Sequence, residues 1–128
     1  MNKFLRFALV GAAGFVVDAV VLFAGLHFAG FNKYLARAVS FLCAATFTWS
    51  ANRRFTFPET AARTGQAREW AKFVAVNAVG GAVNYGTYAA LVTYAADPFA
   101  NPFVALACGS LAGLVFNFFG SKLIVFRA

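Results

Sequence analysis

The chain has 128 residues, of which 62% are hydrophobic, 18% aromatic and only 12% charged, and its formal net charge at pH 7 is +7. A soluble domain of this length needs far more polar surface around its core, so the composition excludes an ordinary soluble globular protein. Nucleic-acid binding is not expected either, because the basic residues gather at the ends of apolar tracts, as membrane topology requires.

Four tracts almost free of charge predict the secondary structure. In chain order they cover residues 7–28, 34–51, 73–95 and 103–121. A helix needs roughly 17–25 residues to cross the hydrocarbon core of a bilayer, and each tract fits that range. The tracts also lack the polar face of a soluble helix. The sequence therefore predicts an all-α integral membrane protein with four transmembrane helices, the first of them uncleaved.

The Lys and Arg residues predict the orientation of these helices. Nine of the eleven precede the first helix, lie between the second and third, or follow the fourth; only Lys33 and Arg37 lie on the other side. Cytoplasmic loops carry the excess of Lys and Arg. Both termini and the middle loop are therefore expected in the cytoplasm.

The two halves of the chain resemble each other. Residues 6–14 and 72–80 share a basic residue, Phe, Val and Gly at matching positions, and this register pairs Asp18 with Asn84. A register three residues longer places Phe57 on Phe126. Because each half contains two helices, both halves enter the membrane from the same side, as two parallel-repeat helical hairpins. We expect one domain over 1–128, with repeat one at about 4–57, a cytoplasmic loop at about 58–69 and repeat two at about 70–127.

Small and polar residues recur on one face of the helices. This stripe consists of Gly11, Gly14 and Asp18 in the first helix, Asn77, Gly80 and Asn84 in the third, and Gly109, Gly113 and Asn117 in the fourth. It can serve helix packing alone, with a few interhelical hydrogen bonds. It can also line a cavity for a hydrophilic cargo, since polar groups inside a membrane usually face a cavity or a partner. Its recurrence in both halves favours the cavity, with the four polar side chains as binding residues and the glycines as packing residues.

Three cations are candidates for binding a phosphate group. Arg53 and Lys122 are a repeat-related pair at the cytoplasmic edge, and Arg37 lies on the outer side, where the topology signal requires no cation. Arginine offers a planar fork that suits phosphate oxygens. For Arg53 and Lys122, the alternative to phosphate binding is that they only anchor the helix ends at the membrane surface.

No catalytic or metal-binding pattern accompanies these residues. The sequence contains no Ser-His-acid set, no paired carboxylates and no glycine-rich phosphate loop. Cys43 and Cys108 fit no metal-ligand spacing. We therefore expect a protein that is not an enzyme and that uses neither a metal nor a cofactor.

Three motifs carry a resemblance to a known family. They are Phe7-x-x-Val10-Gly11-x-x-Gly14-x-x-x-Asp18, Asn52-Arg53-x-Phe55-x-Phe57 and Lys122-x-x-Val125-Phe126. In their order, and in the four-helix frame, the chain resembles the GtrA-like family of small bacterial membrane proteins over essentially its whole length. The resemblance implies a flippase in the bacterial cytoplasmic (inner) membrane. Such a protein moves a polyprenyl-phosphate-linked monosaccharide, for example undecaprenyl-phosphate glucose, to the outer leaflet for modification of a cell-surface polysaccharide.

The expected partners follow from this resemblance and from the size of the chain. They are the lipid-linked sugar, membrane lipids, a membrane glycosyltransferase and a second copy of the chain. Four helices cannot enclose a large cavity, and a homodimer is the commonest way to complete one. Two alternatives stay open: a non-catalytic assembly subunit for a glycosyltransferase, and a proton-coupled exporter similar to the small multidrug-resistance proteins, with Asp18 as its titrating acid.

Overall fold

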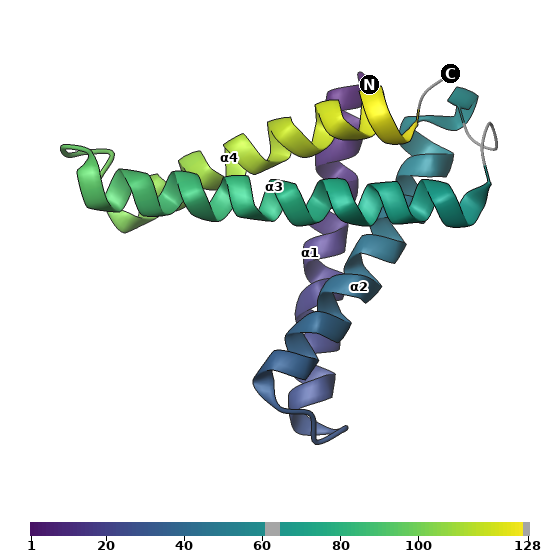
Figure 1. Ribbon diagram of the computed structural model, residues 1–128, viewed down its shortest axis with the longest axis horizontal. Coiled ribbons are helices and arrows are strands. Elements are labelled where there is room, and N and C mark those ends of the chain that lie inside the picture. The colour runs from purple at the N-terminus through teal and green to yellow at the C-terminus, as the bar shows by residue number, and fades with distance from the viewer. Residues whose placement is uncertain (61–64, 127–128) are drawn as a thin grey trace.

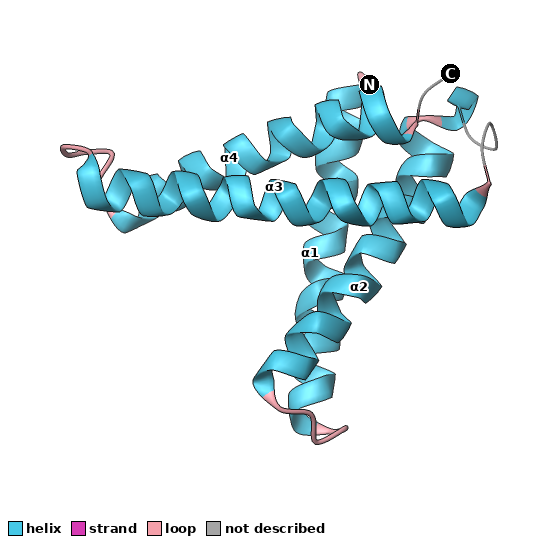
Figure 2. Ribbon diagram, viewed as in Figure 1, coloured by secondary structure: helices cyan, strands magenta, loops and turns pink. Residues whose placement is uncertain are grey.

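The computed structural model describes residues 1–60 and 65–126, in which four long α-helices follow one another (Figure 1). They are α1 (Lys3–His27), α2 (Lys33–Ala51), α3 (Gln66–Tyr94) and α4 (Pro102–Gly120). The π-helices η1 (Asn52–Thr56) and η3 (Ser121–Val125) continue α2 and α4, and the 3₁₀-helix η2 (Pro58–Thr60) follows η1. The described residues contain no strand, so the predicted all-helical fold with four long helices is confirmed (Figure 2).

The second helix of each hairpin begins and ends in the same way. Asn32 precedes α2 and Asn101 precedes α4, and each side-chain oxygen accepts hydrogen bonds from two backbone N–H groups of the first turn. These N–H groups have no acceptor within the helix, so an asparagine cap stabilises the start. Both helices have 19 residues and pass directly into a five-residue π-helix. The second helix of each hairpin therefore has the same cap, the same length and the same π-helical extension. That the two hairpins arose by duplication stays a prediction.

The start of α3 differs from the expected loop boundary. The loop was expected at about 58–69, but α3 begins at Gln66 and includes Glu69 and Lys72. An acidic residue in the first turn is favourable, because the N-terminus of a helix carries a partial positive charge. The charged residues Glu69 and Lys72 predict a loop at this point, but they are also compatible with a helix that extends beyond the apolar tract. Arg63, one of the inner basic residues, lies outside the described residues, as does Arg127.

The helices form two antiparallel hairpins, α1 with α2 and α3 with α4, that run from a common junction in different directions (Figure 1). The loop tips at residues 28–32 and 95–101 consequently lie far apart. The start of α1, the end of α4 and the connection around η1 lie at the junction end. Contacts between the hairpins are made by α2 with α3 and by α1 with α4, and they are far fewer than contacts within each hairpin.

Phenylalanine side chains hold the junction together. Phe57 and Phe126, which follow the two π-helices, stack with ring centroids 5.0 Å apart and an interplanar angle of 16°. Phe118 lies edge-on to Phe7 at 5.6 Å, which joins α4 to α1. All four rings are buried, together with Phe73 of α3. Aromatic pairs in such geometries stabilise by more than the burial of their area alone.

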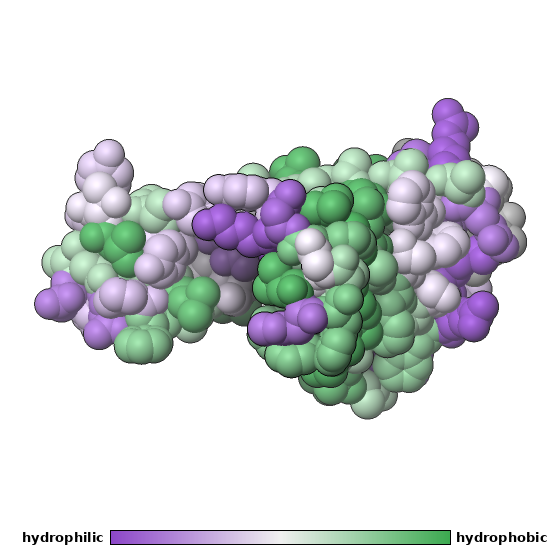
Figure 3. Space-filling model, turned by 90° about the horizontal axis from the view of Figure 1, so that it is seen from below, coloured by the Kyte–Doolittle hydropathy of each residue, from purple (hydrophilic) through white to green (hydrophobic). Residues whose placement is uncertain are grey.

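Apolar side chains also cover much of the outside of the protein. Figure 3 shows a broad hydrophobic area over the middle of one face, with hydrophilic residues gathered toward the edges and in one patch. Two helical segments, Lys3–His27 and Pro102–Val125, are long and apolar enough by length and composition to cross a membrane. Exposed apolar surface of this extent is unusual for a soluble monomer and is expected where lipid is the solvent.

Candidate functional site

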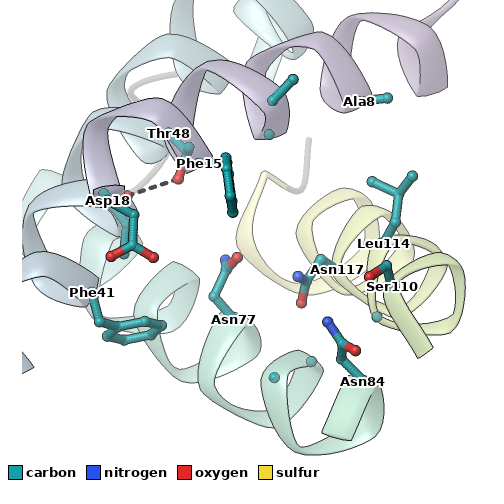
Figure 4. Close-up of a pocket in the computed structure, with 18 residues that line it drawn as sticks. Ala8, Phe15, Asp18, Phe41, Thr48, Asn77, Asn84, Ser110, Leu114 and Asn117 are labelled. Carbon is teal, nitrogen blue, oxygen red and sulfur yellow. Dashed lines mark hydrogen bonds between the residues drawn. The ribbon is translucent and has the colours of Figure 1, made fainter. Parts of the chain in front are cut away.

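A cavity of about 470 Å³ lies between the hairpins, and all four long helices contribute to its lining (Figure 4). The four polar residues predicted from the sequence stripe all line it: Asp18, Asn77, Asn84 and Asn117. Gly11, Gly14, Gly80 and Gly113 line it as well. Small residues leave the volume open, and the polar side chains occupy its walls. The stripe therefore both packs helices and lines a cavity.

Asn117 has an unusual hydrogen-bonding state in this cavity. Its Oδ1 atom is buried and has no hydrogen-bond partner among the described residues. Leaving a buried acceptor unpaired costs about 1–3 kcal/mol. By contrast, Asn77 donates from Nδ2 to the carbonyl oxygen of Phe73, one turn earlier in α3, at 2.9 Å. The Oδ1 atom lies against Gly80 of α3, so Asn117 lines the cavity while this oxygen is enclosed between α3 and α4.

Glycines bring the helices of each hairpin close together. The Asn117 side chain lies over Gly80, where an added Cβ would overlap it, and Asn84 lies against Gly109 and Gly113 in the same way. Gly109 and Gly113 form a GxxxG motif in α4, and this motif therefore serves an interface with α3 inside the chain. In the first hairpin, Gly14 of α1 lies against Thr48 of α2. Gly11 differs from the packing role expected for it, because a Cβ at that position would meet no atom within 4 Å.

Asp18 and Arg37 form an ion pair between α1 and α2. The distance from Arg37 Nη1 to Asp18 Oδ1 is 2.6 Å, and the same nitrogen lies 3.0 Å from the hydroxyl oxygen of Ser40. The Asp18 side chain is 22% exposed and that of Arg37 55%. The sequence predicts Asp18 as a sugar ligand and Arg37 as a phosphate ligand, and it contains no local signal that the two side chains bond to each other. Their pairing balances both charges within the first hairpin.

Glu69 forms a second ion pair that the sequence did not predict. It is 1% exposed, and its Oε1 accepts hydrogen bonds from Arg53 Nε at 2.8 Å and Trp49 Nε1 at 3.1 Å. Expected in the loop, Glu69 lies on the buried face of α3 with Phe73 and Val76. The spacing of four and three residues is the helical signal that could have found it. The Nη2 atom of Arg53 is buried and has no hydrogen-bond partner in the described part of the chain.

The start of α1 is fastened to η1 by two more cations. Lys3 Nζ donates to the carbonyl oxygen of Thr56 at 3.0 Å and to the Glu59 carboxylate, and Arg6 Nη1 donates to the carbonyl oxygen of Phe55 at 3.2 Å. The hydrogen bond from Lys3 holds the pKa of Glu59 below its usual value of 4.5. Lys122 on η3 is exposed and has no ion pair with any residue in 1–60 or 65–126. Among the three cations predicted for phosphate, Lys122 is the one whose charge no acid balances.

Comparison with known proteins identifies the family. Residues 6–126 match the model of the family described as GtrA/DPMS, transmembrane domain. The chain belongs to this family. The predicted GtrA-like resemblance is thereby confirmed, and so is the prediction of a membrane protein. The chain is also similar to a protein of Escherichia coli (strain K12) named prophage bactoprenol-linked glucose translocase homolog, with 30% identity over 128 residues, covering 99% of this chain and 97% of that protein.

In this GtrA/DPMS domain, the predicted site residues fall into two groups. The four polar residues meet at one cavity. The three cations do not meet: Arg37 lies beside that cavity, bonded to Asp18, while Arg53 lies at the junction, bonded to Glu69. Lys122 lies on η3, after α4.

Proposed function

We propose that this chain flips a polyprenyl-phosphate-linked monosaccharide from the cytoplasmic to the outer leaflet of the bacterial cytoplasmic membrane, for modification of a cell-surface polysaccharide. The name of the Escherichia coli relative, a bactoprenol-linked glucose translocase homolog, supports this class of cargo. The proposal also gives a reason for polar residues that would be costly in a protein serving only as a membrane scaffold.

The observation that carries the proposal is the cavity whose lining includes four polar side chains from three helices. Its volume of about 470 Å³ lies within the range of roughly 300–1,000 Å³ that is typical of small-molecule sites. Sugar hydroxyls both donate and accept hydrogen bonds, so they match amide and carboxylate groups. Asp18, Asn77, Asn84 and Asn117 are the proposed sugar ligands.

The phosphate of the cargo requires cations on its route. An unpaired charge in hydrocarbon costs several kcal/mol or more. We assign this role to Lys122 and Arg53 on the inner side, and to Arg37 on the outer side. Lys122 carries an unbalanced positive charge on the exposed surface, which suits first capture of an anionic headgroup.

The lipid tail and the oligomeric state complete the proposal. The two hairpins run in different directions (Figure 1). In this proposal the sugar enters the cavity between them from the side, while the polyprenyl chain stays in the bilayer. We place both termini in the cytoplasm, since nine of the eleven basic residues lie at that end of the helices. A homodimer would cover the open side of each copy. A membrane glycosyltransferase is the expected consumer of the translocated sugar.

Reconstitution of the purified protein into vesicles tests the proposal. The substrate is a short-chain polyprenyl-phosphate glucose with a labelled sugar, and membrane-impermeant periodate reports which sugars face outward. Vesicles with the protein should expose all of the labelled sugar on a timescale at which protein-free vesicles expose only the outer-leaflet share. Asn117→Leu should slow exposure about tenfold, because a hydrogen-bonding group is replaced by an apolar one.

A matched control and a contrary outcome sharpen this test. Leu111→Ala changes the same helix at an exposed position that does not line the cavity, and it should leave the rate unchanged. Equal rates with and without protein, for glucose and other hexoses, would refute flipping and favour the assembly-subunit alternative. The charge bias disfavours the proton-coupled exporter, because exporters of that class pair in inverted orientations and need a weak bias, whereas nine of the eleven Lys and Arg are predicted on one side.

A further inference from the structure

A second, smaller pocket of about 250 Å³ lies beside the main cavity. It is lined by Phe15, Asp18, Ala19, Leu22 and Arg37. Phe15 and Asp18 also line the main cavity, so these two side chains of α1 form the boundary between the two spaces. Figure 4 shows Asp18 at the wall of the main cavity, with its carboxylate directed toward Phe41. The guanidinium that Asp18 binds belongs to the smaller pocket alone.

The charges at this boundary are balanced within the chain. Besides Asp18 and Arg37, the lining of the smaller pocket is apolar. Asp18 is the less exposed partner, at 22% against 55% for Arg37, so loss of the cation would leave a largely enclosed carboxylate without its counter-charge. In this structure Asp18 is the anion that Arg37 binds.

Arg37 is nevertheless open to a second anion. Its side chain is 55% exposed, and the bond to Asp18 uses Nη1. The other two nitrogens of the guanidinium, Nη2 and Nε, can turn toward a phosphate, which accepts two parallel hydrogen bonds from such a group. Asp18 in turn lines a cavity that contains amide groups, so its carboxylate has polar surroundings when it leaves Arg37.

We propose that Asp18 is an exchangeable counter-ion, which holds Arg37 until the phosphate of the lipid-linked cargo enters the smaller pocket and takes its place. This inference rests on the proposed function and adds a step to it. The cation at the boundary is never left unpaired, and the carboxylate, once displaced, turns toward the sugar in the main cavity. Return of Asp18 to Arg37 then expels the phosphate, so the cargo is not trapped midway.

The proposed exchange predicts that a single substitution at Asp18 has opposite effects on phosphate binding and on transport. Removing the competing anion in Asp18→Asn should strengthen binding of polyprenyl phosphate about tenfold, because the cost of displacing Asp18 disappears. The same variant should flip the cargo more slowly, because nothing expels the phosphate. A purely structural ion pair would lower stability in this variant without strengthening any binding.

Binding is measured on the full chain in lipid nanodiscs, with polyprenyl phosphate, uncharged polyprenol and inorganic phosphate as separate probes. Asp18→Asn and Asp18→Ser should both bind polyprenyl phosphate more tightly than wild type, and Arg37→Gln should bind it more weakly. The double variant with Asp18→Asn and Arg37→Gln should resemble Arg37→Gln. Lys33→Gln is the matched control, since it removes an exposed cation on the same side that lies over the Tyr34 ring. It should leave binding unchanged.

A measurement on the unaltered site avoids dependence on how Asp18 variants fold. Asp18 and Asp97 are the two aspartates of the sequence. In protein with ¹³C-labelled aspartate carboxyls, polyprenyl phosphate should shift an infrared carboxylate band, and polyprenol should not. The shift should persist in Asp97→Asn, which assigns it to Asp18.

The outcomes separate this inference from the proposed function. No band shift, or unchanged or weaker binding in folded Asp18 variants, would overturn the exchange even if wild-type vesicles flip the cargo. Tighter binding without any flipping would keep the exchange and refute the flippase. An equal effect with inorganic phosphate would keep the exchange and assign the pocket to free phosphate rather than to a lipid headgroup.

Discussion

Arg53 of η1 and Glu69 of α3 form an ion pair, Nε to Oε1 at 2.8 Å, that joins the two hairpins at their junction. Glu69 is 1% exposed and the Arg53 side chain 14%, so both charges have largely left water. Trp49 Nε1 also donates to this carboxylate, and Trp70 Nε1 donates to Thr46 Oγ1 across the same helix pair at 2.9 Å. With few other contacts between the hairpins, these polar bonds and the phenylalanine cluster determine how the hairpins meet.

Glu69→Gln should destabilise the protein by about 3–5 kcal/mol, because it leaves the buried Arg53 without its counter-charge. Denaturation in detergent, followed by circular dichroism, measures this. Glu59→Gln is the matched control, since its ion pair with Lys3 is exposed and should contribute little. If both variants unfold at the same denaturant concentration as wild type, the Arg53–Glu69 bond does not hold the junction.

Gly80→Ala should destabilise the second hairpin, whereas Gly81→Ala should not. A Cβ at Gly80 would overlap the Asn117 side chain, and overpacking of this kind costs about 1–3 kcal/mol. A Cβ at Gly81 meets nothing within 4 Å, and alanine is the better helix former. Thermal melting of the two variants side by side gives the comparison, and a lower midpoint for Gly81→Ala would contradict this packing.

Removing proposed phosphate ligands should impair flipping more than removing a cation outside the site. Arg37→Ala and Lys122→Ala should each slow translocation by about tenfold or more, because a charge-assisted contact to phosphate is lost. Arg37→Lys should recover only part of the rate, since an ammonium cannot make the two parallel bonds of a guanidinium. The vesicle assay at matched protein amounts provides the measurement.

Arg68→Ala supplies the comparison for these cation variants. Arg68 is exposed in the first turn of α3 and has no ion pair within the described residues. Its loss should leave the rate unchanged. Equal rates for all of these variants would end the phosphate assignment and leave the cations as topology anchors.

Single-cysteine labelling should place Gln66 in the cytoplasm and Asn101 outside. Gln66 begins α3 at the junction, and Asn101 precedes α4 at the opposite end of the same hairpin. Cys43 and Cys108 are free thiols and are replaced first. An impermeant maleimide should label position 101 in intact cells and position 66 only after lysis. Labelling of position 66 from outside would reverse the proposed orientation.

Acid should remove a small stabilising contribution of the Lys3–Glu59 pair. The pKa of Glu59 in the folded protein is lowered from 4.5, chiefly by the hydrogen bond from Lys3. A lowered folded-state pKa stabilises the fold above the unfolded-state pKa, and this stabilisation is lost as the pH falls through the folded-state value. The melting temperatures of wild type and Glu59→Gln should therefore differ slightly at pH 7 and converge below pH 4.5. A difference that persists in acid would contradict this assignment.

The sequence alone determined the helical elements, because the signals for them are local. The apolar tract at 34–51 predicts a helix that the structure places at Lys33–Ala51, and the tract at 103–121 predicts Pro102–Gly120. Runs of apolar residues indicate segments that lie in the bilayer, and the basic residues between them indicate segments at the membrane surface. Helical spacing likewise placed Asp18, Asn77, Asn84 and Asn117 on common faces, and these four residues line one cavity.

Only the tertiary structure decided which charged groups meet. Arg37 is 19 residues from Asp18 and Arg53 is 16 residues from Glu69, and neither separation is a spacing within one helix. Such pairs depend on how two helices pack and in which direction each hairpin leaves the junction. Side-chain sizes set that packing, as where Asn117 lies over Gly80. Hydropathy describes how each segment partitions into the bilayer, but ion pairs between segments arise from distances that exist only after the helices have packed.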